Sequence, residues 1–125
     1  IKRGGNPGKG LLALPGGFLA PDKTLRENCV KELKEETRIN LPMALLDGLI
    51  RDSHIFDAPK RSSRGRTISQ GFLINIDINI EDGLPLVKGG DDASKAMWVP
   101  IASLGKLEDK FFEDHIHIIR HFLGA

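Results

Sequence analysis

The feature that most constrains the fold is a regular alternation of residue types between positions 68 and 80. The odd positions carry small or polar residues, with Leu73 as the apolar exception. The even positions carry Ile68, Gln70, Phe72, Ile74, Ile76, Ile78 and Ile80. Because successive side chains of a strand point to opposite faces, this period of two predicts one long, half-buried strand.

A helix is predicted well before this strand. Thr24 is followed three residues later by Glu27, and this pair forms a capping-box pattern. The helix should therefore begin near Leu25 and run to about Thr37. The preceding Pro15-Gly16-Gly17 stops a short apolar run and predicts a turn.

Two shorter strands and a C-terminal helix complete the predicted elements. The stretch Met43–Arg51 is mostly apolar and reads as a strand, with Ile55–Phe56 as its continuation, and Lys95–Pro100 reads as another. A last helix is expected from about Glu108. Its apolar face comprises Phe111, Phe112, His115, Ile118, Ile119, Phe122 and Leu123. This order of elements indicates an α+β or α/β sandwich with a mixed sheet.

Composition limits the class of protein. A chain of 125 residues suits one domain, covering residues 1–125, and its 18 basic and 17 acidic residues leave a net charge of +1. This near-neutral charge disfavours nucleic acid or an anionic membrane as a partner. The single Cys29 excludes an internal disulfide framework and fits a cytoplasmic location. No secretory signal is visible, and no apolar run approaches the roughly 20 residues of a membrane span.

The predicted first helix gathers acidic side chains on one side. At about 100° per residue, Glu35 and Glu36 lie within about 60° of Glu32 around the helix axis. Like charges this close repel unless a cation lies among them, and carboxylate oxygens favour Mg²⁺ or Mn²⁺. The alternative is an ordinary solvated helix on which Lys31 pairs with Glu27 or Glu35.

The residues around this helix carry a family resemblance. The diglycine Gly16-Gly17 would let the backbone approach a ligand closely, with a plain turn as the alternative. From position 17 to 39 the chain resembles the Nudix box, G-x5-E-x7-R-E-U-x-E-E-x-G-U, in register and without a gap. The matching residues are Gly17, Glu32, Leu33, Glu35, Glu36 and Ile39. Lys23, Lys31 and Arg38 depart from the pattern, in the places of a glutamate, an arginine and a glycine.

Other segments narrow the resemblance to the Nudix half of bacterial bifunctional nicotinamide mononucleotide adenylyltransferase/ADP-ribose pyrophosphatase proteins. These segments are residues 6–18, 56–68, 91–93 with Trp98, and 112–115. The resemblance implies a Nudix-type α/β/α sandwich with a mixed sheet. An adenylyltransferase domain precedes the Nudix domain in that family, and this chain opens at Ile1 without a Met. We therefore expect a C-terminal piece of a longer polypeptide that lacks its N-terminal strand, and the family analogy leaves a homodimer open.

The resemblance implies metal-dependent hydrolysis of the pyrophosphate of ADP-ribose to AMP and ribose 5-phosphate, within NAD metabolism. Mg²⁺ or Mn²⁺ would be held by Gly17, Glu32, Glu35 and Glu36. Glu35 and Glu36 are the expected catalytic residues. The general base is either Glu35 or an acidic residue of the loop 81–92. At most one of the adjacent Asp91 and Asp92 is expected to face the site.

A cluster of basic residues offers groups that bind phosphate. It lies in the predicted loop 57–66 and comprises Lys60, Arg61, Arg64 and Arg66. Guanidinium forks suit phosphate oxygens, so with the resemblance Arg61, Arg64 and Arg66 are predicted to bind the substrate. Asp57 is predicted to accept its ribose hydroxyls. The alternative is a solvated loop in which Asp57 caps a turn.

Aromatic and histidine residues are interpreted more plainly. Trp98 lies in a short apolar stretch and is expected in the core rather than as an adenine platform, whereas Phe18 is a weak candidate for a base contact. None of the four histidines is assigned a catalytic role.

Two other functions stay open at this point. One is a non-catalytic, ADP-ribose-sensing Nudix-like module, and the other is a Nudix hydrolase of another nucleoside diphosphate derivative. The three box glutamates argue against a sensing module, whereas the departures at Lys23, Lys31 and Arg38 argue for one.

Overall fold

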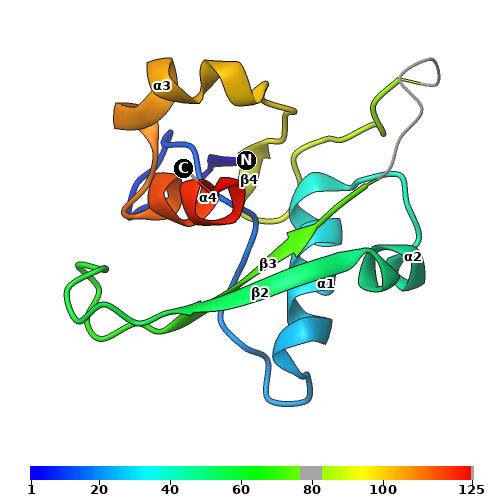
Figure 1. Ribbon diagram of the computed structural model, residues 1–125, viewed down its shortest axis with the longest axis horizontal. Helices are drawn as coiled ribbons and strands as arrows, with labels where there is room; N and C mark the ends of the chain where they lie inside the picture. The colour runs from blue at the N-terminus through cyan, green and yellow to red at the C-terminus, as the bar shows by residue number, and fades with distance from the viewer. Residues whose placement is uncertain (77–82, 125) are drawn as a thin grey trace.

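The computed structural model describes residues 1–76 and 83–124. Figure 1 shows the arrangement of the elements along the chain. In order they are β1 (Lys2–Arg3), α1 (Leu25–Thr37), α2 (Met43–Gly48), β2 (Ile50–Phe56), β3 (Ser69–Ile74), β4 (Ala93–Lys95), η2 (Ile101–Ser103), α3 (Leu104–Leu107), η3 (Glu108–Lys110) and α4 (His115–Leu123). Within these ranges, none of the helices has the length and apolar character needed to cross a bilayer.

Two antiparallel pairs of strands form the sheet structure of the described residues. β2 pairs with β3, placing His54 opposite Gly71, and β1 pairs with β4, placing Lys2 opposite Lys95. Isolated bridges join Leu12 to Lys2 in the antiparallel sense and to Phe111 in the parallel sense. Helices and short strands therefore combine in an α+β fold, as predicted.

The β2–β3 hairpin packs against different helices along its length (Figure 1). At the end near α2, Ile50 and Ile74 pack on the buried cluster of Val30, Ile39 and Leu46. Near its middle, Gly71 closely faces Ile118 and Phe122 of α4. Because of this packing, the long β2–β3 loop lies on the α4 side of the molecule.

The predicted first helix is confirmed as α1. The Thr24 hydroxyl accepts the Glu27 N–H at 3.1 Å, and Glu27 Oε1 accepts the Thr24 N–H at 3.0 Å, which completes the capping box. The helix ends at Arg38, whose φ of 48° is left-handed. Its N–H bonds the Lys34 carbonyl at 2.8 Å. Both ends of α1 are thus fixed by local contacts.

The prediction of a strand over Met43–Arg51 is wrong. Residues 43–48 form the short helix α2, and the strand β2 begins only at Ile50. Pro42, with φ −62°, opens the helix, and its carbonyl accepts the Leu46 N–H at 3.1 Å. One helical turn buries Leu46 completely and leaves Met43 exposed. The predicted continuation over 55–56 is confirmed as the end of β2.

The long alternating strand is confirmed in part. β3 covers Ser69–Ile74, and both Ile74 and Ile76 pack against the core cluster, as the period of two predicts. Ile68 is exposed. The predicted positions 77–80 lie outside the described residues.

The predicted strand over Lys95–Pro100 is misplaced. β4 is Ala93–Lys95, because its partner β1 offers only two residues for pairing. Trp98 is not in the core: it is 42% exposed, and its indole N–H donates to the Pro85 carbonyl at 2.8 Å.

The predicted C-terminal helix is interrupted. Residues 108–110 form the 3₁₀ turn η3, and α4 starts at His115. Between them Phe112 donates its N–H to the Leu12 carbonyl at 2.7 Å, and Glu113 takes a left-handed φ of 46°. The chain leaves the helical path because it pairs with the N-terminal segment, and Ile116 joins the buried face in consequence.

Candidate active site

The last turns of α1 form one wall of the candidate site, and residues 87–93 lie along them. The Lys88 N–H donates to the Thr37 carbonyl at 2.7 Å, and the Gly90 N–H donates to the Glu36 carbonyl at 3.2 Å. A Cβ at Gly90 would lie 2.5 Å from the Glu35 carbonyl oxygen, so only glycine allows this approach. Asp91 follows directly, in a left-handed conformation with φ 51°.

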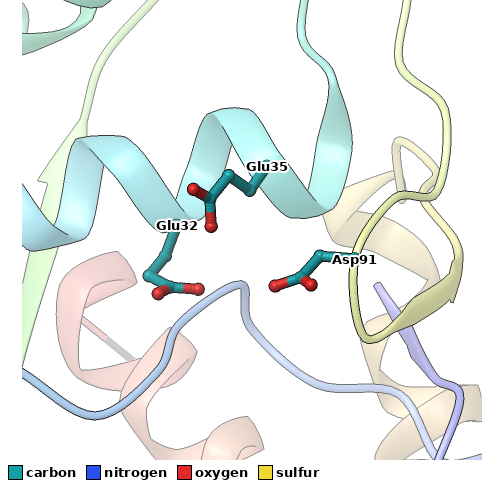
Figure 2. Close-up of side chains that lie close together, drawn as sticks. All are labelled: Glu32, Glu35 and Asp91. Atoms are coloured by element: carbon teal, nitrogen blue, oxygen red, sulfur yellow. The ribbon is translucent and has the colours of Figure 1, made fainter. Parts of the chain in front are cut away.

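This docking brings three carboxylates together. Glu32 and Glu35 of α1 and Asp91 of the loop each offer an oxygen within 4.8 Å of the others. Figure 2 shows their side chains pointing toward one another across a gap between the helix and the loop. The sequence predicted that at most one of two adjacent aspartates would face the site, and the structure places Asp91 there.

Lys31 pairs with two of the three carboxylates. Its Nζ lies 3.1 Å from Glu35 Oε1 and 3.8 Å from Glu32 Oε1. Lysine here stands in the place of the Nudix-box arginine, and it contacts both glutamates as a single point charge.

The diglycine forms a second wall of the site. A Cβ at Gly17 would lie 2.8–3.0 Å from the carboxyl atoms of Glu32, so the absence of a side chain lets the backbone reach the cluster. Burial raises the pKa of Glu32, Lys31 opposes this shift, and the nearby Glu35, Asp91 and Asp92 raise the pKa further. The site therefore holds more negative charge than its own cation balances.

Glu36 links the helix to the diglycine. Its carboxyl is buried, and Oε1 accepts the Gly16 N–H at 2.6 Å. Burial raises the pKa of Glu36 to about 7, with smaller increases from Glu32 and Asp91 and an opposing effect of the Gly16 hydrogen bond. This residue, predicted as a ligand and catalytic group, lies beside the three-carboxylate cluster and fixes the backbone next to it.

The donor chemistry of the site fits a hard divalent cation. Carboxylate oxygens are the ligands that Mg²⁺ and Mn²⁺ prefer, and clustering them is costly without a cation. Glycine at position 17 also lets the backbone lie close to the Glu32 carboxyl, which a Cβ there would force to move. These residues would hold such an ion.

The predicted substrate arginines have different surroundings. Arg61 is buried and forms a bidentate ion pair with Asp114, at 2.8 and 3.0 Å. Its remaining nitrogen donates to the Ser69 hydroxyl at 2.8 Å. Every branch of this guanidinium thus has a partner within the chain.

Arg64 is more accessible than Arg61 and lies beside aromatic side chains. Its side chain is 35% exposed, 3.7 Å from Glu113 and 3.4 Å from the Ser62 hydroxyl. The guanidinium carbon also lies 5.5 Å from the ring centre of Phe18, the strongly exposed residue that follows Gly17. The loop of residues 57–66, which we name the arginine loop, therefore meets the segment after the diglycine where Arg64 lies beside Phe18.

Asp57 and Arg66 lie at the outer part of the loop. Arg66 donates to the Asp57 carbonyl at 2.6 Å, and both residues are exposed. Asp57 also lines a shallow pocket of about 210 Å³, together with His54, Phe56 and Arg61. The structure does not bring Asp57 or Arg66 into contact with the carboxylate cluster.

The histidines have structural surroundings. His115 Nδ1 accepts the Leu14 N–H at 2.9 Å, and burial lowers the pKa of His115 to about 4. His54 and His121 stack with ring centres 4.0 Å apart beside Phe56.

Asp91 is the cluster residue that the sequence left undecided. Its adjacency to Asp92 marked the segment, but the choice between them depends on the left-handed turn at Asp91 and on the docking of Gly90 against α1.

Comparison with known proteins gives consistent results. The model of the NUDIX domain matches residues 1–122. An ADP-ribose pyrophosphatase of Methanocaldococcus jannaschii is 37% identical over 123 residues, covering 98% of this chain and 63% of the relative. The chain thus spans less than two thirds of that relative's length.

Solved structures show the same similarity. A bifunctional NMN adenylyltransferase/ADP ribose pyrophosphatase of Francisella tularensis, crystallised with AMP and Mn ion, is 40% identical with a TM-score of 0.93. The match covers 99% of this chain and 36% of that one. The NUDIX domain of Shewanella oneidensis NrtR, complexed with ADP ribose, has a TM-score of 0.76 at 21% identity over 96% of this chain and 71% of that one, and shows the fold alone. The chain belongs to the Nudix family.

Proposed function

We propose that this domain hydrolyses the pyrophosphate of ADP-ribose to AMP and ribose 5-phosphate with Mg²⁺ or Mn²⁺ bound. The observation that carries the proposal is the convergence of Glu32, Glu35 and Asp91 beside Gly17, which has no Cβ to collide with the Glu32 carboxyl. The relatives from M. jannaschii and F. tularensis support the choice of ADP-ribose among nucleoside diphosphate derivatives.

The metal ligands follow from the chemistry of the cluster. Glu32, Glu35 and Asp91 would hold the ion, with Glu36 and the Gly17 backbone as further candidates. When bound, the ion supplies positive charge at the pyrophosphate oxygens and lowers the pKa of bound water. Without such charge, the carboxylates would repel the substrate.

Side chains of the protein position the backbone at the metal site and supply the general base. Glu36 holds the diglycine against α1 through the Gly16 N–H, which keeps the metal side of the site in place. Glu35 is the proposed general base, and Asp91 is the alternative, because both are exposed carboxylates in the cluster. Glu35 stays the proposed catalytic base, and Glu36, also predicted to be catalytic, is proposed as a further metal ligand that positions the diglycine.

The substrate side of the site is proposed to centre on Arg64. Its guanidinium is partly exposed beside Phe18, and its contacts to Ser62 and Glu113 are long. Arginine forks suit a pyrophosphate or a terminal phosphate. Arg66 and Asp57 would contact the part of the substrate farthest from the metal. Arg61 is instead proposed to hold the loop in place through its ion pair with Asp114.

A wider setting is proposed from the relatives and the composition. The bifunctional F. tularensis protein suggests an adenylyltransferase domain in the same polypeptide and a role in NAD metabolism. The free Cys29 suits the reducing cytoplasm. A homodimer is the remaining proposal about assembly.

The decisive experiment separates an enzyme from a sensing module. The domain is incubated with ADP-ribose and MnCl₂ or MgCl₂, and AMP is measured in wild type, Glu36→Gln and the exposed-carboxylate control Asp109→Asn. AMP from wild type and Asp109→Asn but not from Glu36→Gln supports the proposal. Tight ADP-ribose binding without AMP supports a sensing module, which the departures at Lys23, Lys31 and Arg38 favour.

The same assay tests the substrate. Other nucleoside diphosphate derivatives, tested at equal concentration, should be cleaved with lower kcat/KM than ADP-ribose. A derivative cleaved faster would replace ADP-ribose as the proposed substrate.

A further inference from the structure

One short segment outside the box contacts both halves of the proposed site. Residues 111–115 run from the end of η3 into the first residue of α4, and the left-handed Glu113 breaks the helical path there. This segment, which we name the hinge segment, contains two adjacent carboxylates, Glu113 and Asp114. The assigned metal and substrate groups include neither of them.

On one side, the hinge segment holds the arginine loop. Both carboxylate oxygens of Asp114 accept hydrogen bonds from the buried guanidinium of Arg61. Glu113 Oε1 accepts the hydroxyl proton of the buried Ser62 at 3.0 Å, and the same hydroxyl oxygen accepts the Arg64 N–H at 3.2 Å. Two consecutive acidic residues therefore fix Arg61, Ser62 and Arg64, in a loop about 50 residues earlier in the sequence.

On the other side, the hinge segment holds the approach to the diglycine. The Leu12 carbonyl accepts the Phe112 N–H at 2.7 Å, and the Leu14 N–H donates to His115 Nδ1 at 2.9 Å. Pro15, Gly16 and Gly17 are the next three residues of the chain. The hinge segment thus ties the diglycine and the arginine loop to one rigid point.

We propose that Glu113 and Asp114 are positioning residues that hold Arg64 at the distance from the metal site that the substrate's phosphates require. This inference rests on the proposed function, and it assigns to the hinge segment a role in substrate affinity. Bidentate pairing gives directional constraint as well as energy, and the burial of Arg61 removes competing solvent. Glu113 holds the backbone N–H of Arg64 through the Ser62 hydroxyl, so a single intermediate group separates it from the proposed substrate-binding residue.

The prediction is a rise in KM with little change in kcat. Glu113→Gln and Ser62→Ala each weaken the anchor of Arg64 without removing a partner of Arg61, and each should raise the KM for ADP-ribose about ten-fold. Mn²⁺ activation should stay unchanged, because neither residue touches the carboxylate cluster. Asp114→Asn should have the larger effect, but it leaves a buried guanidinium with a weakened partner and is therefore not relied on alone.

The matched control is Glu108→Gln. Glu108 also pairs with an arginine, Arg120 of α4, at 2.6 Å, but that pair is on the surface and does not touch the loop. Glu108→Gln should leave KM, kcat and the loop unchanged.

A second readout does not depend on catalysis. Trypsin cuts after arginine, and the arginine loop contains Arg61, Arg64 and Arg66. If the loop is loosened, cleavage at these sites should be several-fold faster in Glu113→Gln and Ser62→Ala, but not in Glu108→Gln. Binding of ADP-ribose by the Glu36→Gln protein, measured by calorimetry with and without Glu113→Gln, gives affinity without turnover.

The outcomes separate this inference from the proposed function. Weakened binding and faster tryptic cleavage in Glu113→Gln and Ser62→Ala support the positioning role, even if wild type produces no AMP. Unchanged affinity and cleavage in both variants would overturn it while leaving the hydrolase assignment intact. A fall in kcat at constant KM would also overturn it, because that result places the residues in the chemical step.

Discussion

The Glu36 carboxyl accepts the Gly16 N–H at 2.6 Å, and Glu36 is only 4% exposed to solvent. A carboxyl in this position both anchors the diglycine and resists ionisation, since burial raises its pKa to about 7. Two roles, backbone anchor and member of an acidic site, thus meet in one side chain. The metal-free protein should therefore respond to pH through Glu36.

The first prediction concerns the stability of the metal-free protein. The pKa of Glu36 is about 7 in the folded protein against 4.5 for an ordinary glutamate. Between pH 4.5 and 7 the folded state therefore binds a proton that the unfolded state has released. Its stabilising contribution is complete below pH 4.5 and is lost as the pH rises through 7. Glu36→Gln imitates the protonated form, so in EDTA it should match wild type at pH 5 and exceed it at pH 8 by roughly 3 kcal/mol at most.

Denaturant unfolding of both proteins at the two pH values checks this. Mn²⁺ should reverse the order at pH 8, because the ion favours ionised carboxylates in the folded protein. A constant difference between the proteins at pH 5 and 8 would contradict the raised pKa.

The second prediction concerns acid denaturation and His115. Burial lowers the pKa of His115 to about 4 from an ordinary 6.5, so below pH 6.5 the unfolded state binds the additional proton. The stabilising contribution is complete above pH 6.5 and is lost as the pH falls toward 4, by roughly 3 kcal/mol at most. His115→Gln should be less stable than wild type at pH 7 and should lose less stability on acidification.

His117→Gln is the matched control, since His117 is exposed on the same helix. Unfolding free energies at pH 7, 5.5 and 4.5 compare the three proteins. Parallel pH profiles for wild type and His115→Gln would show that His115 does not drive the acid transition.

Local features of the sequence predicted the local parts of this fold. The Thr24–Glu27 pair identified the start of α1, because a capping box involves neighbours only. The turn of α2 was missed because the apolar residues 43–46 suit a strand as well as a helix, and Pro42 decides between them. Period alone cannot resolve so short a segment.

Features that depend on distant partners were beyond the sequence. The break before α4 exists because Phe112 pairs with Leu12, about a hundred residues away. The buried ion pair of Arg61 has the same origin, since its partner Asp114 lies 53 residues along the chain. The box glutamates were identifiable by family resemblance, whereas the third carboxylate of the cluster required the docked conformation of Asp91.

The third prediction concerns the departure at position 38. Arg38 has a left-handed φ of 48°, a conformation that glycine adopts without strain and other residues do not. Arg38→Gly should therefore be more stable than Arg38→Ala by about 1 kcal/mol, since both variants lose the guanidinium and only alanine keeps the Cβ. Thermal unfolding of the two variants measures the difference, and equal stabilities would show that the helix end tolerates a side chain.

The last prediction tests the contact between Gly17 and the acidic cluster. A Cβ at Gly17 would lie 2.8–3.0 Å from the carboxyl atoms of Glu32, and these atoms end a flexible side chain that can move aside. Gly17→Ala should therefore shift Glu32 away from Glu35 and Asp91 at little cost in stability, and it should weaken Mn²⁺ binding about ten-fold, the effect of losing one good ligand contact. Gly16→Ala is the control, because a Cβ at Gly16 meets no atom within 4 Å. Titration with Mn²⁺ and thermal unfolding of both variants separate the two effects. If both variants bind Mn²⁺ as wild type does, Glu32 is not a ligand, and the ion binds elsewhere than in the cluster of Figure 2.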